Sequence, residues 1–223
     1  MRKNTLNCII FAGMVLLSAS CGRGEWPADN DVRISWDRST FTEMKSVNVQ
    51  NAGFVEENLY YPRIKRLSDG ALLMSFENDH FGWDIYVRRS EDNGKTWSPA
   101  TSSAGEDTKV YVNPDFIQLA DGRILLAYQW RYKKGYNDLV NTNNNCGIEV
   151  MFSSDGGRTF TEPVEVYRGR CWEPAMLQLP SGEIQMYITS SQELIDKMSA
   201  PQTVVIRSFD NGKTWQGKEG CGQ

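Results

Sequence analysis

The sequence contains one histidine, His80, and few of the patterns that build metal or nucleotide sites. A single histidine gives a zinc centre or a serine–histidine–aspartate triad little to build on. We therefore expect His80 to be a hydrogen-bonding residue at the rim of a cleft or a simple loop residue. No glycine-rich phosphate loop joins a strand to a helix, so neither a cofactor nor a metal ion is expected. The net charge is −4 without a basic stripe, which argues against nucleic acid as a partner.

Long hydrophobic runs are also scarce. The apolar run at residues 9–17 is too short to span a membrane as a stable helix. It follows Arg2 and Lys3 and precedes Ser18-Ala19-Ser20-Cys21, which resembles a bacterial lipobox with Cys21 as the lipidated first mature residue. We predict a lipoprotein signal peptide at 1–20, with an ordinary cleaved signal as the alternative. A tether and N-terminal strand region should follow at 21–50. The resemblance implies a bacterial cell envelope protein that contacts the membrane through its lipid anchor only.

The cysteines of the mature chain do not form a metal motif. Apart from Cys21, they are Cys146, Cys171 and Cys221, an odd set without a Cys-x-x-Cys pair. An envelope location would permit a disulfide between Cys146 and Cys171. Two separate buried thiols are equally compatible with the sequence.

An octapeptide with the pattern Ser-x-Asp-x-Gly-x-Thr-aromatic occurs three times, at residues 90–97, 153–160 and 208–215. Its Asp and Gly residues favour a tight turn, because glycine tolerates positive φ and aspartate can bond nearby backbone amides. A group that recurs in every repeat cannot be a unique catalytic residue. We therefore predict a structural role for the octapeptides.

A second repeat precedes each octapeptide and places a proline eight positions before a glycine, at residues 62–70, 114–122 and 174–182. An apolar strand follows each glycine, so each unit begins with a β-hairpin. A third strand leads into each octapeptide, and a fourth is clearest at residues 164–167. Four-stranded antiparallel units at spacings of about 55–63 residues predict an all-β fold of β-propeller blades.

The octapeptides resemble the Asp-box of the sialidase superfamily, and residues 84–98 are especially similar to its first Asp-box region. The resemblance covers about residues 55–217 and implies a partial sialidase-type propeller over 51–223. Members of the superfamily are usually six-bladed rings, whereas about three blades are encoded here. We accordingly expect a truncated chain, a fragment or half of an assembly, and no turnover from three blades alone.

Positions where the repeats differ chemically are better site candidates than the repeated ones. Because strand direction alternates, the start of each first strand and the loop between the second and third strands lie on one face of the blades. The loops between the second and third strands are expected at residues 77–80 in the first unit and 129–145 in the second. The residues beside the repeated prolines and in those loops are the candidates. They are Tyr61, Arg63, Asn113, Asp115, Trp172 and Glu173, together with Asp79, His80 and Arg131.

The resemblance also implies roles for these residues. Glycoside hydrolysis needs two carboxyl groups around one bond. Glu173, in Cys-Trp-Glu-Pro, resembles the catalytic glutamate of exo-acting arabinan hydrolases, and Asp79 lies in a loop comparable with that of the sialidase acid/base aspartate. Asp115 is the third catalytic candidate. The substrate-binding candidates are Arg63, Tyr61, Asn113, Trp172, His80 and Arg131.

These residues predict a glycoside hydrolase that acts on the terminal sugars of a glycan or oligosaccharide. The three-arginine clamp with which sialidases hold the carboxylate of sialic acid is not matched, because Tyr60 occupies the position of its first arginine. Sialidase and exo-arabinanase specificities therefore both stay open. The alternatives are a non-catalytic carbohydrate-binding or scaffold propeller and an inactive remnant.

Overall fold

A computed structural model describes residues 59–78, 83–105, 107–135, 144–191 and 201–220. All of them belong to one compact unit, Met44–Gln223. No helix in these ranges is long and apolar enough to cross a membrane. The predicted signal peptide and Cys21 lie outside the described residues, as do Asp79 and His80.

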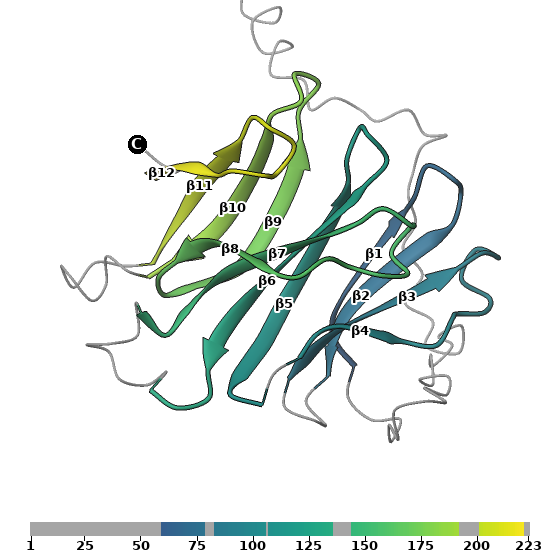
Figure 1. The fold of residues 1–223 in the computed structure, drawn as a ribbon, viewed down its shortest axis with the longest axis horizontal. Coiled ribbons are helices and arrows are strands. Elements are labelled where there is room, and N and C mark those ends of the chain that lie inside the picture. Colours follow the sequence, from purple (N-terminus) through teal and green to yellow (C-terminus); the bar gives the residue numbers. More distant parts are fainter. Residues whose placement is uncertain (1–58, 79–82, 106, 136–143, 192–200, 221–223) are drawn as a thin grey trace, which may run out of the picture. The chain divides into compact units, whose positions relative to one another are not determined.

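The described strands form three antiparallel sheets of four strands each, which we call blades 1, 2 and 3 (Figure 1). In each blade the strands are hydrogen-bonded in sequence order. Their bounds are β1 (Leu59–Arg66), β2 (Leu72–Asn78), β3 (Asp84–Ser90) and β4 (Thr101–Ala104) in blade 1; β5 (Lys109–Gln118), β6 (Ile124–Tyr132), β7 (Cys146–Ser153) and β8 (Val164–Arg168) in blade 2; and β9 (Cys171–Gln178), β10 (Ile184–Ser190), β11 (Gln202–Ser208) and β12 (Gln216–Gly220) in blade 3. The predicted all-β fold of propeller blades is confirmed.

Two hydrophobic cores lie between neighbouring blades. Blades 1 and 2 share a core that includes Leu73, Ile85, Phe116 and Leu126. Blades 2 and 3 share another, built from side chains that include Leu125, Ile148, Met186 and Ile206. Each blade is therefore stabilised mainly by burying its apolar face against the next blade.

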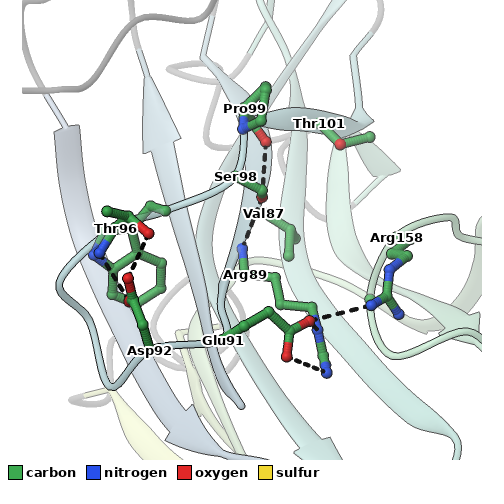
Figure 2. Close-up of a pocket in the computed structure, with 11 residues that line it drawn as sticks. Val87, Arg89, Glu91, Asp92, Thr96, Ser98, Pro99, Thr101 and Arg158 are labelled. Atoms are coloured by element: carbon green, nitrogen blue, oxygen red, sulfur yellow. Dashed lines mark hydrogen bonds and ion pairs between the residues drawn. The ribbon is translucent and has the colours of Figure 1, made fainter.

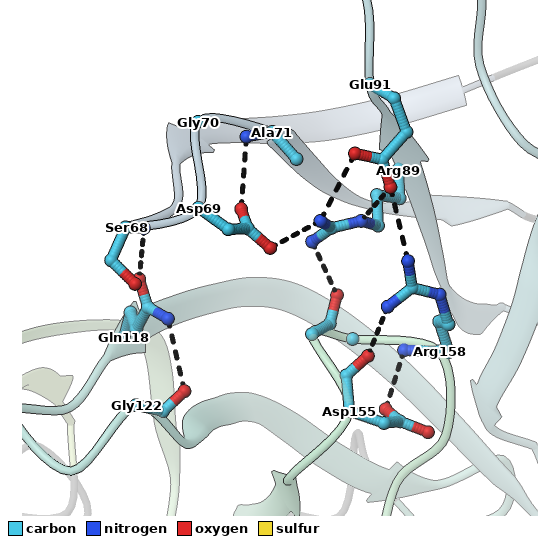
Figure 3. A network of polar contacts seen from close by, with 12 residues as sticks. Ser68, Asp69, Gly70, Ala71, Arg89, Glu91, Gln118, Gly122, Asp155 and Arg158 are labelled. Carbon is cyan, nitrogen blue, oxygen red and sulfur yellow. Dashed lines mark hydrogen bonds and ion pairs between the residues drawn. The ribbon is translucent and has the colours of Figure 1, made fainter.

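Polar joints also connect the blades, as Figure 3 shows for blades 1 and 2. The Gln118 side chain of β5 accepts a hydrogen bond from the backbone N–H of Ser68 at 2.7 Å and donates one to the carbonyl of Gly122 at 3.1 Å. Gln178 repeats this arrangement one blade later, accepting from the N–H of Ala120 at 2.8 Å. A glutamine at the same position of two repeats thus bonds one backbone N–H of the preceding hairpin and one carbonyl of its own hairpin.

The largest polar joint surrounds Arg89 (Figure 3). Its guanidinium pairs with Asp69 at 2.5 Å and with Glu91 at 2.7 Å, and it donates to the carbonyl of Gly156 in the octapeptide turn of blade 2 at 3.2 Å. Gly157 has φ +86°, and a Cβ atom there would lie 2.7 Å from Leu73 of blade 1. That turn therefore requires glycine both for its backbone conformation and for its close approach to blade 1.

The three octapeptides form the same hydrogen-bonded turn. In each, the serine hydroxyl accepts from the N–H of the glycine at 2.8 Å. The aspartate accepts from the threonine hydroxyl at 2.6 Å. These bonds, first among them those from Thr96 and Thr214, lower the pKa of Asp92 and Asp210 to about 2. The depressed pKa values mean that this stabilisation is present above about pH 4 and is lost as the pH falls toward 2.

Asp155 of the second octapeptide provides a test of this structural role. Asp155→Ala should lower the free energy of unfolding by about 1–3 kcal/mol, because Ser153, Arg158 and Thr159 lose their shared acceptor. Thermal or urea unfolding measures the change, with Glu162→Ala, in the exposed loop after the turn, as the control. An unchanged melting temperature with lost turnover would contradict the structural role.

The two cysteines that the structure describes are free thiols. Cys146 and Cys171 lie at the starts of β7 and β9, and both are buried. Burial raises the pKa of the Cys146 thiol to about 11. The sequence left open a disulfide or two separate thiols, and the structure has two separate buried thiols.

Candidate functional site

The first strand of every blade carries the same irregularity. Between Tyr60 and Arg63 the strand has one more residue than its partner β2, and equivalent register shifts occur in β5 and β9. The residue before the repeated proline has a left-handed backbone in all three blades, with φ of 49° at Tyr61, 56° at Asn113 and 54° at Glu173. Such a β-bulge bends the strand and redirects the side chain of the extra residue.

These three residues converge on one cavity of about 470 Å³. A left-handed conformation costs a non-glycine residue about 1–3 kcal/mol and is retained where the surrounding structure imposes it, commonly at functional sites. The volume falls within the range of about 300–1,000 Å³ for small-molecule sites. The cavity is also lined by Glu77, Trp83, Val112, Arg131, Trp172 and Thr189. Side chains from all three blades thus border one hollow.

Glu77 is the most deeply buried charged group of this cavity, with 1% of its surface exposed. Its Oε2 accepts a hydrogen bond of 2.5 Å from the backbone N–H of Asn113. Burial raises the pKa of Glu77, although that hydrogen bond and the charges of Arg131 and Arg63 act in the opposite direction. The bond also holds the bulge of β5 in place, so Glu77 connects blade 1 to the site residue of blade 2.

Two cavity residues lie on strands where the sequence predicted loops. Glu77 belongs to β2, paired with Tyr60 and Ile85, and Arg131 belongs to β6, paired with Cys146. The loop assignment of these residues was wrong, because the hydrogen-bonded ladder continues past Phe76 in β2 and past Tyr128 in β6. Strand placement fixes both side chains more firmly than a loop would.

Aromatic side chains form much of the cavity wall. Trp83 has φ +70° and stacks on Tyr60 with ring centroids 5.4 Å apart. Trp172 lies beside Arg170, whose guanidinium is 5.1 Å from the centre of the indole ring. Such flat apolar faces, combined with the Asn113 amide, the Thr189 hydroxyl and the charged groups, suit a ligand with apolar faces and many hydroxyl groups.

Other predicted site residues lie elsewhere. Asp115 does not line the cavity: its Oδ1 pairs with Lys65 of β1 at 2.8 Å, and its Oδ2 accepts from the N–H of Met176 of β9 at 2.9 Å. Arg63 does not line the cavity, although its charge acts on Glu77. Of the predicted residues, the cavity brings together Tyr61, Asn113, Arg131, Trp172 and Glu173. Asp79 and His80 lie outside the described residues.

Two further hollows have fewer features of a binding site. The one in Figure 2, of about 580 Å³, is formed by the first octapeptide turn and neighbouring residues of blades 1 and 2. Its charged groups pair with one another, Arg158 with Glu91 at 3.2 Å and Arg89 with the same carboxylate at 2.7 Å. The other, of about 780 Å³, is lined by the hairpin ends of the three blades. Of these three cavities in the described part of the chain, the one at the bulges combines strained residues with a buried carboxyl group.

Comparison with known proteins gives a consistent set of relatives. The BNR/Asp-box repeat family matches residues 206–216. A sialidase of Micromonospora viridifaciens is 26% identical over 74% of this chain and 29% of its own length. A sialidase of Paraclostridium sordellii is 22% identical over 96% of this chain and 58% of its own length. The chain therefore spans less than two thirds of either relative.

A solved structure with a similar fold is the alpha-L-arabinofuranosidase of Fusarium graminearum in complex with an iminosugar inhibitor. It superposes with a TM-score of 0.56 at 19% identity, over 75% of this chain and 50% of that one. At this identity the similarity concerns the arrangement of the strands.

Proposed function

We propose that this chain, a sialidase-like superfamily protein, forms part of a glycoside hydrolase that removes terminal sugars from glycans at its bulge cavity. One observation carries the proposal. The same strained bulge in three blades turns Tyr61, Asn113 and Glu173 into a single cavity with two tryptophans and Arg131. The relatives named sialidase and arabinofuranosidase support a glycan as the substrate.

Each group has a role in this proposal. Glu173 is the catalytic carboxylate, since it lies exposed at the cavity where an anomeric carbon and a water molecule can approach it. Trp83 and Trp172 provide apolar faces for the sugar ring, and Asn113 and Arg131 bind its hydroxyl groups. With Arg131 as the arginine on the cavity wall, the described residues do not provide a three-arginine clamp for a carboxylate sugar. Neutral terminal sugars, arabinofuranosides included, are therefore candidate substrates beside sialic acid.

Carbohydrate binding without hydrolysis is the second candidate. The position of Asp115 favours it, because this predicted catalytic carboxylate is committed to Lys65 and to the backbone of Met176 outside the cavity. Of the predicted catalytic residues in the described ranges, Glu173 is the one that lines the cavity.

A substrate panel with a binding measurement separates the two candidates. The full-length gene product is incubated with aryl glycosides of neutral pentoses and hexoses and of sialic acid, and release of the aryl alcohol is followed. Tryptophan fluorescence measures binding of the corresponding free sugars, since Trp83 and Trp172 line the cavity. Turnover of at least one of these glycosides supports the proposal. Binding without turnover supports the second candidate, and neither binding nor turnover refutes both.

We also propose that the protein is anchored to the bacterial cell envelope through Cys21, on the lipobox-like segment that precedes it. Cys21→Ser should move the protein from the membrane fraction to the soluble fraction, because a protein without its acyl chains loses their burial in the bilayer. Fractionation followed by immunoblotting measures the change, with Cys8→Ser, inside the predicted signal peptide, as the control. Equal membrane recovery of Cys21→Ser and the parent would refute the anchor.

A further inference from the structure

The bulge cavity contains a carboxyl group that the predicted chemistry did not include. Glu77 is far from Glu173 in the sequence, yet both line the same cavity. Glu77 belongs to β2 of blade 1, and Glu173 belongs to β9 of blade 3. Hydrolysis of a glycosidic bond needs two carboxyl groups, about 5–9.5 Å apart, on the two sides of that bond. A cavity of about 470 Å³ that both groups border is of a size to hold one sugar ring between them.

We propose that Glu77 is the second catalytic carboxyl group of the cavity, the acid that protonates the glycosidic oxygen. The assignment rests on the proposed function. In the step, the bond between the anomeric carbon and the glycosidic oxygen breaks, its electron pair goes to that oxygen, and the oxygen takes the proton of Glu77. The anomeric carbon receives a new electron pair from the Glu173 carboxylate, or from a water whose proton Glu173 accepts. The leaving group departs as a neutral alcohol.

The surroundings of Glu77 suit an acid. Only 1% of its surface is exposed, and a buried carboxyl group favours its neutral form. Burial raises its pKa against the opposing effects of the Asn113 N–H and of Arg131 and Arg63, in the direction that a general acid working near neutral pH requires. Glu173, by contrast, is exposed. Two carboxyl groups in one cavity thus differ in environment, as an acid and its partner should.

The position of Glu77 is also well defined. Its carboxyl group is fixed by the 2.5 Å bond from Asn113, and its backbone is part of the ladder between β1 and β3. A group held by two strands and one neighbouring backbone amide stays oriented while a proton leaves it.

The experiment compares leaving groups, because only a poor leaving group needs an acid. In the full-length gene product, Glu77→Gln should lower kcat/KM on an alkyl glycoside or disaccharide by about 10²–10⁴-fold. On the 2,4-dinitrophenyl glycoside of the same sugar the loss should be less than about 10-fold, since that anion leaves unprotonated. The wild-type rate should fall as the pH rises through the pKa of the acid, and this fall should disappear in Glu77→Gln.

Two further variants control the experiment. Glu149→Gln replaces another buried glutamate, 6% exposed, that does not line the cavity, and should affect both substrates equally. Asp79→Asn tests the aspartate predicted from sequence. If Glu77→Gln does not fold, Glu77→Asp keeps an acid and should show a smaller loss that is still selective for the poor leaving group.

Each outcome of these experiments supports or overturns the assignment of Glu77. Equal loss on both leaving groups, or no loss, overturns the assignment of Glu77 while hydrolysis by the wild type leaves the proposed function standing. Selective loss in Asp79→Asn instead of Glu77→Gln gives the acid role to Asp79. If the wild type hydrolyses no glycoside, the proposed function fails and the assignment fails with it.

Discussion

Replacing Glu173 with glutamine should reduce kcat/KM on the best glycoside substrate by about 10²–10⁴-fold. Glutamine has nearly the shape of glutamate but can neither accept a proton nor attack an anomeric carbon. A glutamine residue can still adopt the left-handed backbone conformation before Pro174, where φ is 54°, so the bulge should persist. The expected result is lost chemistry with retained sugar binding.

Three measurements check this result: the steady-state kinetics, the dissociation constant of the free sugar from tryptophan fluorescence, and the melting temperature. Glu183→Gln is the matched control, because Glu183 belongs to the same blade but pairs with Arg207 and does not line the cavity. Turnover in Glu173→Gln equal to that of the parent would remove Glu173 from the chemistry. A large fall in melting temperature would instead show that Glu173 has a structural role in the bulge.

The repeats made most of the fold predictable. The spacing between proline and glycine located the first hairpin of each blade, because the hairpin turn needs a residue with positive φ, and Gly70, Gly122 and Gly182 all have φ near 90°. The octapeptides located the turn after each third strand. Two fourth strands, β4 (Thr101–Ala104) and β12 (Gln216–Gly220), could not be assigned in advance, since they contain few apolar residues.

The bulges could not be predicted from the sequence. A residue before proline is normally extended, whereas Tyr61, Asn113 and Glu173 are left-handed. The side chains of tyrosine, asparagine and glutamate have no common chemistry that would predict the same backbone conformation. That conformation arises from the hydrogen-bonded ladders on either side of the bulge. The comparison of repeats nevertheless selected these positions, because residues at corresponding places in different blades can differ where they meet a ligand.

No catalytic role was predicted for Glu77, for a related reason. Residues 77–80 were expected to form a loop, and the resemblance to sialidases implied a catalytic role for Asp79, two residues later. The ladder of β2 extends to Asn78. The backbone N–H of Asn113, which fixes Glu77, comes from another blade, 36 residues away. A contact between residues so far apart in the sequence depends on how the blades pack, and local sequence patterns carry no information about that packing.

Asp115 presents the opposite case, a predicted catalytic residue whose contacts indicate a structural role. Its carboxylate joins the first strands of three blades, since it belongs to β5 and holds Lys65 of β1 and the N–H of Met176 of β9. Only 5% of the residue is exposed. Removing this carboxylate would leave the buried N–H of Met176 without its acceptor, whereas Lys65, with 38% of its side chain exposed, can be solvated by water.

Asp115→Ala should therefore lower the free energy of unfolding by about 1.5–3 kcal/mol, which corresponds to a fall in melting temperature of about 3–12 °C for a protein of this size. Asp115→Asn retains an acceptor and should cost less. Asp121→Ala serves as the control, because Asp121 is a surface residue paired with Arg123 at 2.7 Å and should cost at most about 1 kcal/mol. Calorimetry and urea unfolding measure all three variants. If Asp115→Ala instead keeps the melting temperature of the parent and loses turnover, Asp115 has the catalytic role that its position after Pro114 suggested.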